Sequence, residues 1–297
     1  MKSKRNILVL GGDLRQKRAA EGLSELGWSP TLWGVWQREG EGSDGALTLG
    51  DLLGEAEAVI LPLPASADGQ HLNCPFAGAE DRPTLSQIFS HLPSGAAVIG
   101  GRIPEEAARL AEGRGLRVFD YFESEAFQIH NAYTTAEAAL SIAMNRLERN
   151  IRGSRVAITG FGRIAKHLVG LLLPMGARIT VAARRSGDRA FAESMGCDSL
   201  ALEEAGAIFS LAEGYDVIYN TVPHWLFRRE FLERMDERTF LLDLASVPGG
   251  VDICAAKELG CNVLWATSLP GKYAPESAGE LIATCLDEIL RREVGLP

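Results

Sequence analysis

The stretch R-V-A-I-T-G-F-G-R-I-A, residues 155–165, decides the fold of this chain. Its second half satisfies the pattern G-x-G-x-x-G/A between an apolar strand, 155–159, and an amphipathic helix expected over 164–173. The first glycine permits a tight turn, the second lets the backbone approach a pyrophosphate, and the small Ala165 lets the helix lie close to the strand. The stretch therefore predicts a βαβ unit that binds a dinucleotide; a glycine-rich turn without a ligand is the plainer alternative.

The end of the next expected strand, 177–183, indicates which dinucleotide. NAD-specific sites place an Asp or Glu there for the ribose 2′-hydroxyl, whereas this chain reads Ala183, Arg184, Arg185 and Ser186. Two guanidinium groups and a hydroxyl suit a 2′-phosphate. We therefore expect NADP, with NAD as the second possibility; the alternative is that the arginines lie at a solvated strand end.

Further strands expected over 217–220, 240–244 and 262–265 complete the alternation of a doubly wound sheet. Polar residues follow two of these strands, at the edge where nicotinamide and ribose lie. For Asn220 and Thr221 a helix cap is the alternative. The residues predicted to face the cofactor are Gly160, Phe161, Gly162, Arg163, Ile164, Ala183, Arg184, Arg185, Ser186, Asn220, Thr221, Val222, Pro223, Asp243 and Ala245.

The N-terminal half repeats the strand-turn-helix pattern with a strand over 6–10, the turn Gly-Gly-Asp and a helix expected over 14–26. Between residues 65 and 83 the periodicity is lost, which predicts an irregular loop near the carboxyl edge of the sheet. The other expected elements are strands 29–35, 58–61, 96–100 and 117–119 and a helix over 104–112.

These patterns predict an α/β chain of two Rossmann-like doubly wound parallel-sheet domains with a cleft between them. Residues 1–132 form the substrate-side domain, and residues 133–297 form the nucleotide domain with a linker helix over 135–147. The last helix, 275–292, can pack back on the first domain.

Composition excludes several other classes. The 297 residues are 46% apolar and 23% charged, as in packed globular proteins. A net charge of −9 argues against a nucleic-acid surface. The five cysteines form no C-x-x-C pair and no zinc-ligand pattern with histidine, so we expect reduced thiols and no metal. The apolar run Ile7–Leu10 is too short for a signal peptide and no run is long enough to span a membrane, so a cytoplasmic location is expected.

Several stretches together resemble the family of dipicolinate synthase A subunits. The P-G-G and P-G-K turns and the D-Y-F-E segment are more specific than the nucleotide motif, which many dehydrogenases share. The matching stretches are G-G-D-L-R-Q (11–16), D-Y-F-E (120–123), N-A-Y-T-T-A-E (131–137), G-F-G-R (160–163), A-A-R (182–184), D-L-A-S-V-P-G-G-V-D (243–252) and L-P-G-K-Y-A-P (269–275).

This resemblance implies an enzyme of endospore formers that acts in the mother cell and produces pyridine-2,6-dicarboxylate, or dipicolinate, from a dihydro- or hydroxytetrahydro-precursor. It also implies a partner, a flavoprotein-like B subunit. The layout is similar to that of 2-hydroxyacid and alanine dehydrogenases, and a homo-oligomer is expected because symmetric association is common among such folds.

A dicarboxylate substrate requires cations and hydrogen-bond donors. We expect Arg15, Arg102 and Lys272 to supply the cations. Lys272, Ser246 and Asp13 are the candidate catalytic groups, although Lys272 also fits a surface loop, Ser246 a turn and Asp13 a helix cap. Residues expected near the domain junction, and therefore near the substrate, are Glu123, Asn131 and Thr134.

Two rival functions remain open on the sequence. A D-2-hydroxyacid dehydrogenase resembles this layout but uses a catalytic His late in the chain, and no His follows His224. Where that family has its Arg, this chain reads Ala245-Ser246-Val247-Pro248. A non-catalytic protein that only binds NADP is the second rival, because no evident acid–base pair stands out.

Overall fold

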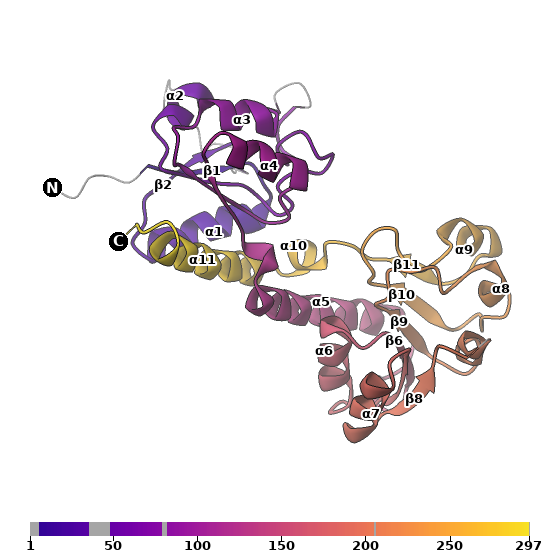
Figure 1. Cartoon of the computed structure of the whole chain (residues 1–297). Coiled ribbons are helices and arrows are strands. Elements are labelled where there is room, and N and C mark those ends of the chain that lie inside the picture. The colour runs from indigo at the N-terminus through magenta and orange to yellow at the C-terminus, as the bar shows by residue number, and fades with distance from the viewer. Residues whose placement is uncertain (1–5, 36–47, 79–81, 205, 297) are drawn as a thin grey trace. The chain divides into compact units, whose positions relative to one another are not determined.

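The computed structural model describes residues 6–35, 48–78, 82–204 and 206–296. The chain divides into two compact units (Figure 1). Unit 1 contains the described residues up to Asn131 and those from Ala274 onward, and unit 2 contains Ala132–Tyr273. The described residues from Ala274 onward thus belong to unit 1, whereas the expected domain boundary at residue 133 places them in the second domain. Each unit is described by itself.

Unit 1 is built on a five-stranded parallel sheet in the order β2-β1-β3-β4-β5. Its strands are β1 (Ile7–Leu10), β2 (Pro30–Trp33), β3 (Ala58–Ile60), β4 (Ala97–Gly100) and β5 (Arg117–Asp120), and its helices are α1 (Leu14–Glu25), α2 (Leu49–Gly54), α3 (Leu85–His91), α4 (Glu105–Gly113), the short 3₁₀ helix η2 (Tyr121–Glu123) and α11 (Pro275–Arg292).

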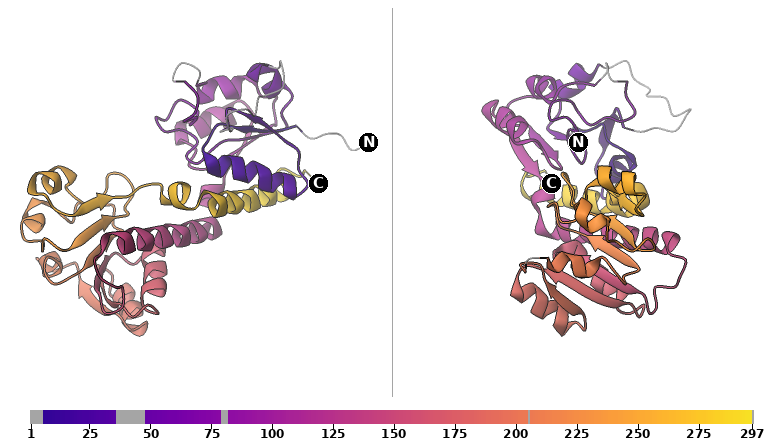
Figure 2. Two further views of the ribbon diagram at one scale, coloured as in Figure 1. Left: turned by 180° about the vertical axis from the view of Figure 1, so that it is seen from behind. Right: turned by 90° about the vertical axis from the view of Figure 1, so that its right-hand side faces the viewer.

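Alternate residues of β1 face opposite sides of the unit 1 sheet. Ile7 and Val9 join a buried cluster with α1 and α11, and Leu8 and Leu10 join one with α2, α3 and α4. Helices therefore cover both faces, as expected for a parallel sheet. Figures 1 and 2 show α1 and α11 side by side on one face. Arg18 of α1 joins them by contacting Glu276 and Glu280 of α11.

Unit 2 carries a six-stranded parallel sheet in the order β11-β10-β9-β6-β7-β8. Its strands are β6 (Arg155–Thr159), β7 (Arg178–Ala183), β8 (Asp198–Ala201), β9 (Val217–Asn220), β10 (Phe240–Asp243) and β11 (Val263–Trp265), and its helices are α6 (Arg163–Leu172), α7 (Ser186–Ser194), the 3₁₀ helix η3 (Ala207–Leu211), α8 (Arg229–Leu232), α9 (Ile253–Leu259) and α10 (Leu269–Tyr273). Numbered from β6, this is the 3-2-1-4-5-6 order of the Rossmann fold.

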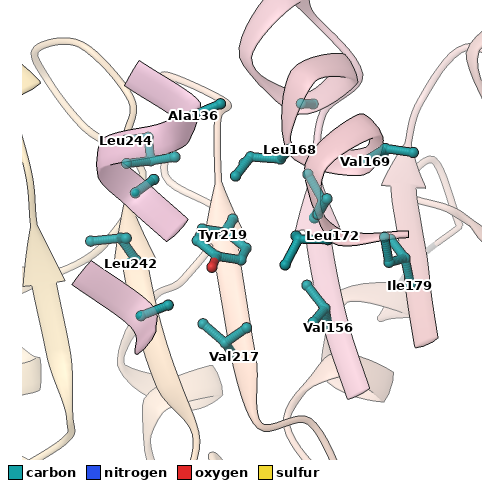
Figure 3. Close-up of a cluster of buried hydrophobic side chains, with 14 of the residues drawn as sticks. Ala136, Val156, Leu168, Val169, Leu172, Ile179, Val217, Tyr219, Leu242 and Leu244 are labelled. Carbon is teal, nitrogen blue, oxygen red and sulfur yellow. The ribbon is translucent and has the colours of Figure 1, made fainter. Parts of the chain in front are cut away.

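Buried side chains on both faces of the unit 2 sheet fix its helices. On one face, Val156 and Ile158 of β6 pack with α6 and with the part of α5 (Glu125–Arg146) that lies in unit 2 (Figure 3). On the other, Ala157 packs with α8 and α9. The predicted fold class of two doubly wound parallel sheets is confirmed by both topologies.

Three local expectations differ from the structure. Helix α5 begins at Glu125 rather than at Thr135, because Phe127 packs edge-on against Tyr121 and Phe122 and extends the helix into unit 1. Strand β8 was not predicted, since its D-S-L-A sequence is short and partly polar. Lys272 lies in helix α10 rather than in a loop turn. No helix in the described part of the chain is long and apolar enough to cross a membrane.

Candidate functional site

The glycine turn after β6 has a backbone shape that only glycine suits at its first position. Gly160 has a φ of +82°, and a methyl group there would lie 2.7 Å from the Thr221 hydroxyl oxygen. At Gly162, by contrast, an added methyl group would meet no atom within 4 Å. The turn is therefore packed on its inner side and open at Gly162, as close approach of a phosphate requires.

Two helices begin beside this turn without a side-chain cap. Gly162 is the N-cap of α6 and Arg185 is the N-cap of α7, and neither accepts a hydrogen bond from the first turn with its side chain. The first N–H groups of a helix have no partner within the helix, and they favour an anion. Both helix ends are thus suited to phosphate groups.

An open pocket of about 590 Å³ lies at these helix ends, entirely within unit 2. It lies at the carboxyl ends of β6, β7, β8 and β9, and the strand order reverses between β6 and β9, which is where open α/β sheets bind ligands. Its lining residues are Gly160, Phe161, Gly162, Lys166, Ala183, Arg184, Arg185, Asp188, Leu202, Val222, Pro223, His224 and Leu226.

The charge of the pocket is predominantly positive. Lys166, Arg184 and Arg185 line it together with one carboxylate, that of Asp188. Within the described part of the chain these three cations make no ion pair. Arg189, the next arginine of α7, contacts Glu203 and two backbone carbonyls and is neutralised. The three unpaired cations therefore attract an anionic ligand.

Eight of the predicted cofactor residues line this pocket, and five lining residues were not predicted. The missed residues are Lys166, Asp188, Leu202, His224 and Leu226. Lys166 directly follows the G-x-G-x-x-A motif, and Asp188 lies in the first turn of α7. Arg163, Ile164 and Ser186 flank the lining residues in the first turns of α6 and α7 but do not line the pocket.

Asn220 and Asp243, which were expected to face the cofactor, are fully buried and bonded to the protein. Asn220 donates to Asp243 at 2.7 Å and accepts from the Thr159 hydroxyl at 2.6 Å. Asp243 also accepts the N–H groups of Ala245 and Gly250. A buried polar network of this kind fixes the loops at the ends of β6, β9 and β10. We infer that these residues shape the pocket edge rather than line it.

The remaining expected residues of this edge also have local roles. The Thr221 hydroxyl donates to the Thr159 carbonyl at 2.8 Å. Ala245 is buried, and its carbonyl accepts the indole N–H of Trp265. Ser246 is exposed, and its carbonyl accepts the N–H of Gly249 at 2.8 Å, so it begins the turn proposed as its alternative role.

In unit 1, Asp13 and Arg15 are brought together. The Asp13 carboxylate caps α1 by accepting the Arg15 N–H at 3.0 Å, and the Arg15 guanidinium binds the same carboxylate at 2.8 Å. That guanidinium also donates to the Leu63 carbonyl at 2.7 Å and is nearly buried. Both charges are therefore already paired within the protein.

Arg102, another substrate candidate, lies in a strained loop that the D-Y-F-E segment holds. Its φ is +52°, and the Asp120 carboxylate accepts the N–H groups of Arg102, Ile103 and Phe122. Its guanidinium lies 4.5 Å above the Phe122 ring and is exposed. Asp120 and Phe122 thus have a structural account, and Arg102 has no carboxylate partner among the described residues.

The other candidates lie on η2, α5 and α10. Glu123 is exposed in η2, and Asn131 is partly buried on α5 in unit 1. Thr134 lies on α5 in unit 2, and Lys272 is exposed in α10 of the same unit. Within the described residues neither a metal-binding cluster nor a disulfide is found.

The two units match two family models in turn. Residues 6–122 match the N-terminal domain of the dipicolinate synthase A subunits, and residues 122–246 match the NAD-binding domain of the D-isomer-specific 2-hydroxyacid dehydrogenases. The second match covers the glycine turn and every residue that lines the pocket. An oxidoreductase role with a nicotinamide cofactor is thereby supported.

Similar proteins match almost the whole chain. The dipicolinate synthase A subunit of Bacillus subtilis (strain 168) is 29% identical over 96% of this chain and 95% of its own length. The crystal structure of the same synthase component from Bacillus subtilis has a TM-score of 0.84 at 27% identity and covers 99% of this chain and 98% of its own. That of its counterpart from Bacillus halodurans has a TM-score of 0.81 at 25% identity, with 98% and 99% covered. The family indicated by the sequence motifs, that of the dipicolinate synthase A subunits, is therefore confirmed as the one that this chain resembles over nearly its whole length.

Proposed function

We propose that this protein is an NADP-dependent oxidoreductase that forms pyridine-2,6-dicarboxylate from a dihydro- or hydroxytetrahydropyridine dicarboxylate. The observation that carries the proposal is the unit 2 pocket, where an open glycine turn, two uncapped helix ends and three unpaired cations occur together. The name of the relatives supplies the product.

The choice of NADP rests on charge. Strand β7 ends at Ala183, and the next two residues are Arg184 and Arg185, so no carboxylate stands at the strand end. Asp188 lies farther along, in the first turn of α7, and is outnumbered by the three cations of the pocket. A 2′-phosphate carries up to two negative charges, which this arrangement favours over a 2′-hydroxyl.

The residues around Gly160 fit such a cofactor. The N–H groups of the first turn of α6 would hold the pyrophosphate, and Arg184, Arg185 and the Ser186 hydroxyl would hold the 2′-phosphate. When bound, the nicotinamide supplies the acceptor for a hydride. The network of Asn220 and Asp243 would keep the adjoining loops in place during the reaction.

The reaction balances as loss of one water from the hydroxytetrahydro-ring, followed by loss of one hydride and one proton from the dihydro-ring, which becomes aromatic. Protein groups must bind two carboxylates and accept that proton. Arg102 and Lys272 remain the candidates for the carboxylates, because Arg15 is already neutralised by Asp13. Lys272 and Ser246 remain the candidates for the proton, and Glu123, Asn131 and Thr134 remain candidates for substrate contacts.

A D-2-hydroxyacid dehydrogenase is the second candidate, because the match of residues 122–246 favours it. The chain argues against it in two places. His224 is its last histidine, so the late catalytic histidine of that chemistry is missing, and Ala245-Ser246-Val247-Pro248 stands where its arginine is expected. Reduction of 2-oxo acids by the isolated chain would favour this candidate.

On the same resemblance we propose that the partner is a flavoprotein-like second protein, the B subunit, and that the mother cell of a sporulating bacterium is the place of action. A chain that serves only to bind NADP for that partner is the non-catalytic alternative. Self-association into a symmetric oligomer is also proposed, since such folds often pair.

The test is to add NADP⁺ and freshly prepared hydroxytetrahydrodipicolinate to the purified chain and to follow pyridine-dicarboxylate absorbance with NADPH formation. We expect the two signals to rise in equal amounts. Product only after addition of the flavoprotein-like partner, with NADP⁺ binding intact, would favour the non-catalytic alternative. Absence of NADP⁺ binding to well-folded protein would contradict the proposal itself.

A further inference from the structure

Lys166 is the one lysine among the pocket-lining residues, and neither the glycine motif nor the strand-end arginines assign it a role. It lies in the first turn of α6, directly after Ala165 of the motif. Its Nζ atom lies 5.7 Å from the centre of the Phe161 ring and 5.5 Å from that of the Phe191 ring. Two aromatic faces thus hold the ammonium group in position.

These two rings come from different parts of unit 2. Phe161 belongs to the glycine turn, whereas Phe191 belongs to α7, the helix that follows Arg184 and Arg185. The ring centres are 6.0 Å apart. Contact with both rings therefore holds the ammonium between the glycine turn and α7, in the pocket that Arg184 and Arg185 also line.

The ammonium has no carboxylate partner within the described residues, and Asp188 is the one acidic residue that lines the same pocket. Three like charges facing one pocket repel one another until an anion binds. In the proposed function, backbone N–H groups at the N-terminus of α6 bind the pyrophosphate. The Lys166 side chain is therefore available to bind a different anionic group.

We propose that Lys166 is a second determinant of NADP preference and contacts the 2′-phosphate from the side opposite the β7 strand end. The inference rests on the proposed function and deepens it. The 2′-phosphate is then bound between α6 and α7, with Arg184 and Arg185 on one wall and Lys166 on the other, and the aromatic pair Phe161 and Phe191 orients the lysine.

The experiment compares Lys166→Met with wild type by titration of NADP⁺, NAD⁺ and adenosine 2′,5′-bisphosphate. Methionine keeps the long apolar stem over the rings and removes the charge. We expect the affinity for NADP⁺ and for the bisphosphate to fall about tenfold, as for loss of one charged hydrogen bond. The affinity for NAD⁺ should stay within about twofold. Lys166→Arg should restore most of the NADP⁺ affinity.

Lys257→Met is the matched control, since Lys257 lies exposed on α9 of the same unit and outside the pocket. It should leave all three affinities unchanged. Phe191→Leu, which removes one of the two aromatic faces, should give a smaller loss for NADP⁺ than Lys166→Met.

If Lys166→Met lowered the affinities for NADP⁺ and NAD⁺ equally, the inference would be overturned, and the lysine would be assigned to the pyrophosphate. Unchanged affinities would also overturn it, because Lys166 would then be an ordinary surface cation. Failure of the proposed function is distinguishable, since in that case the wild-type chain binds neither nicotinamide nucleotide.

Discussion

In both units the first strand is followed by a glycine turn and a helix, yet the two turns are used differently. In unit 1, a methyl group at Gly12 would lie 2.5 Å from the Gln16 Cβ atom, and one at Gly11 would lie 2.8 Å from the Asn73 carbonyl oxygen. In unit 2, the space at Gly162 is empty of protein atoms for 4 Å. The first turn is filled by its own chain, whereas the second is packed at Gly160 and open at Gly162.

The helix ends that follow the turns differ in the same way. Asp13 caps α1 and neutralises Arg15, so the polar groups at the start of that helix are satisfied internally. Asp68 and Asp120 likewise accept backbone N–H groups in the loops after β3 and β4. Helices α6 and α7 have no side-chain cap, and Lys166, Arg184 and Arg185, which line the pocket beside them, make no ion pair within the described residues.

A glycine turn after a parallel strand is therefore insufficient evidence of a phosphate site. The distinguishing feature is what satisfies the first N–H groups of the following helix. An aspartate at the N-cap closes the site, whereas a glycine or arginine at the N-cap leaves it open to an anion. Four substitutions test this contrast.

Gly162→Asp should have the largest effect, because it gives α6 the cap that α1 has. Aspartate is a favourable N-cap residue and the site has room for it, so thermal stability should be unchanged or slightly higher. Its carboxylate would occupy the proposed pyrophosphate seat, and nucleotide affinity should fall more than about 100-fold. Calorimetric titration and thermal unfolding measure the two effects; near-normal affinity with intact folding would refute the open-turn interpretation.

Arg184→Ala should have the next largest effect on nucleotide affinity, and it should weaken the binding of NADP⁺ but not that of NAD⁺. Loss of a charge-assisted contact to the 2′-phosphate should weaken NADP⁺ about 10- to 30-fold and leave NAD⁺ nearly unchanged. Titrations at low and at high salt measure both affinities, and the loss should shrink at high salt because screening weakens surface charges. Equal weakening of both nucleotides would remove the basis for choosing NADP.

Asp13→Ala should affect stability rather than nucleotide binding. It removes the N-cap of α1 and leaves the nearly buried Arg15 guanidinium without its carboxylate. The combined cost should be about 2 kcal/mol, roughly half of it from the cap. Urea unfolding of wild type, Asp13→Ala and Asp13→Asn measures the cost. A large loss of turnover without loss of stability would instead identify Asp13 as a catalytic group.

Most of the fold could be predicted from the sequence because it is carried by local patterns. An apolar strand such as β6, a glycine turn and a stretch with helical spacing of apolar residues together indicate one βα unit. Parallel pairing of the strands follows from the alternation of strands and helices along the chain. Strand β8 was not predicted, because it lies at the edge of the sheet and its residues are half-buried or exposed. Such a strand needs no run of apolar residues. The start of α5 at Glu125 was not predicted, because it depends on packing between aromatic rings.

Residues of the candidate site could be predicted where a local sequence motif indicates them. They could not be predicted where a polar side chain can bind either a ligand or another residue of the protein. Gly160 and Arg184, which the sequence predicts to contact the cofactor, line the pocket. Asn220 and Asp243 have residue types that suit a ligand equally well, and only the structure shows that they bind each other. Lys166 was missed because the motif ends one residue before it and its position depends on Phe191, distant in sequence.

The smallest effect concerns pH and the Asp68 carboxylate in the loop after β3. Hydrogen bonds from the N–H groups of His71 and Gln70 and from the His71 ring hold the pKa of Asp68 well below its usual value of 3.8. A carboxyl whose pKa is lowered on folding stabilises the protein above its unfolded-state pKa, and this contribution is lost as the pH falls through the folded-state pKa. Asp68→Asn should therefore be slightly less stable than wild type at neutral pH, and the difference should shrink steadily as the pH falls below 3.8. Urea unfolding at neutral and at acidic pH measures this difference; a gap that stays constant into the acid range would show that the charge of Asp68 contributes nothing to holding the loop.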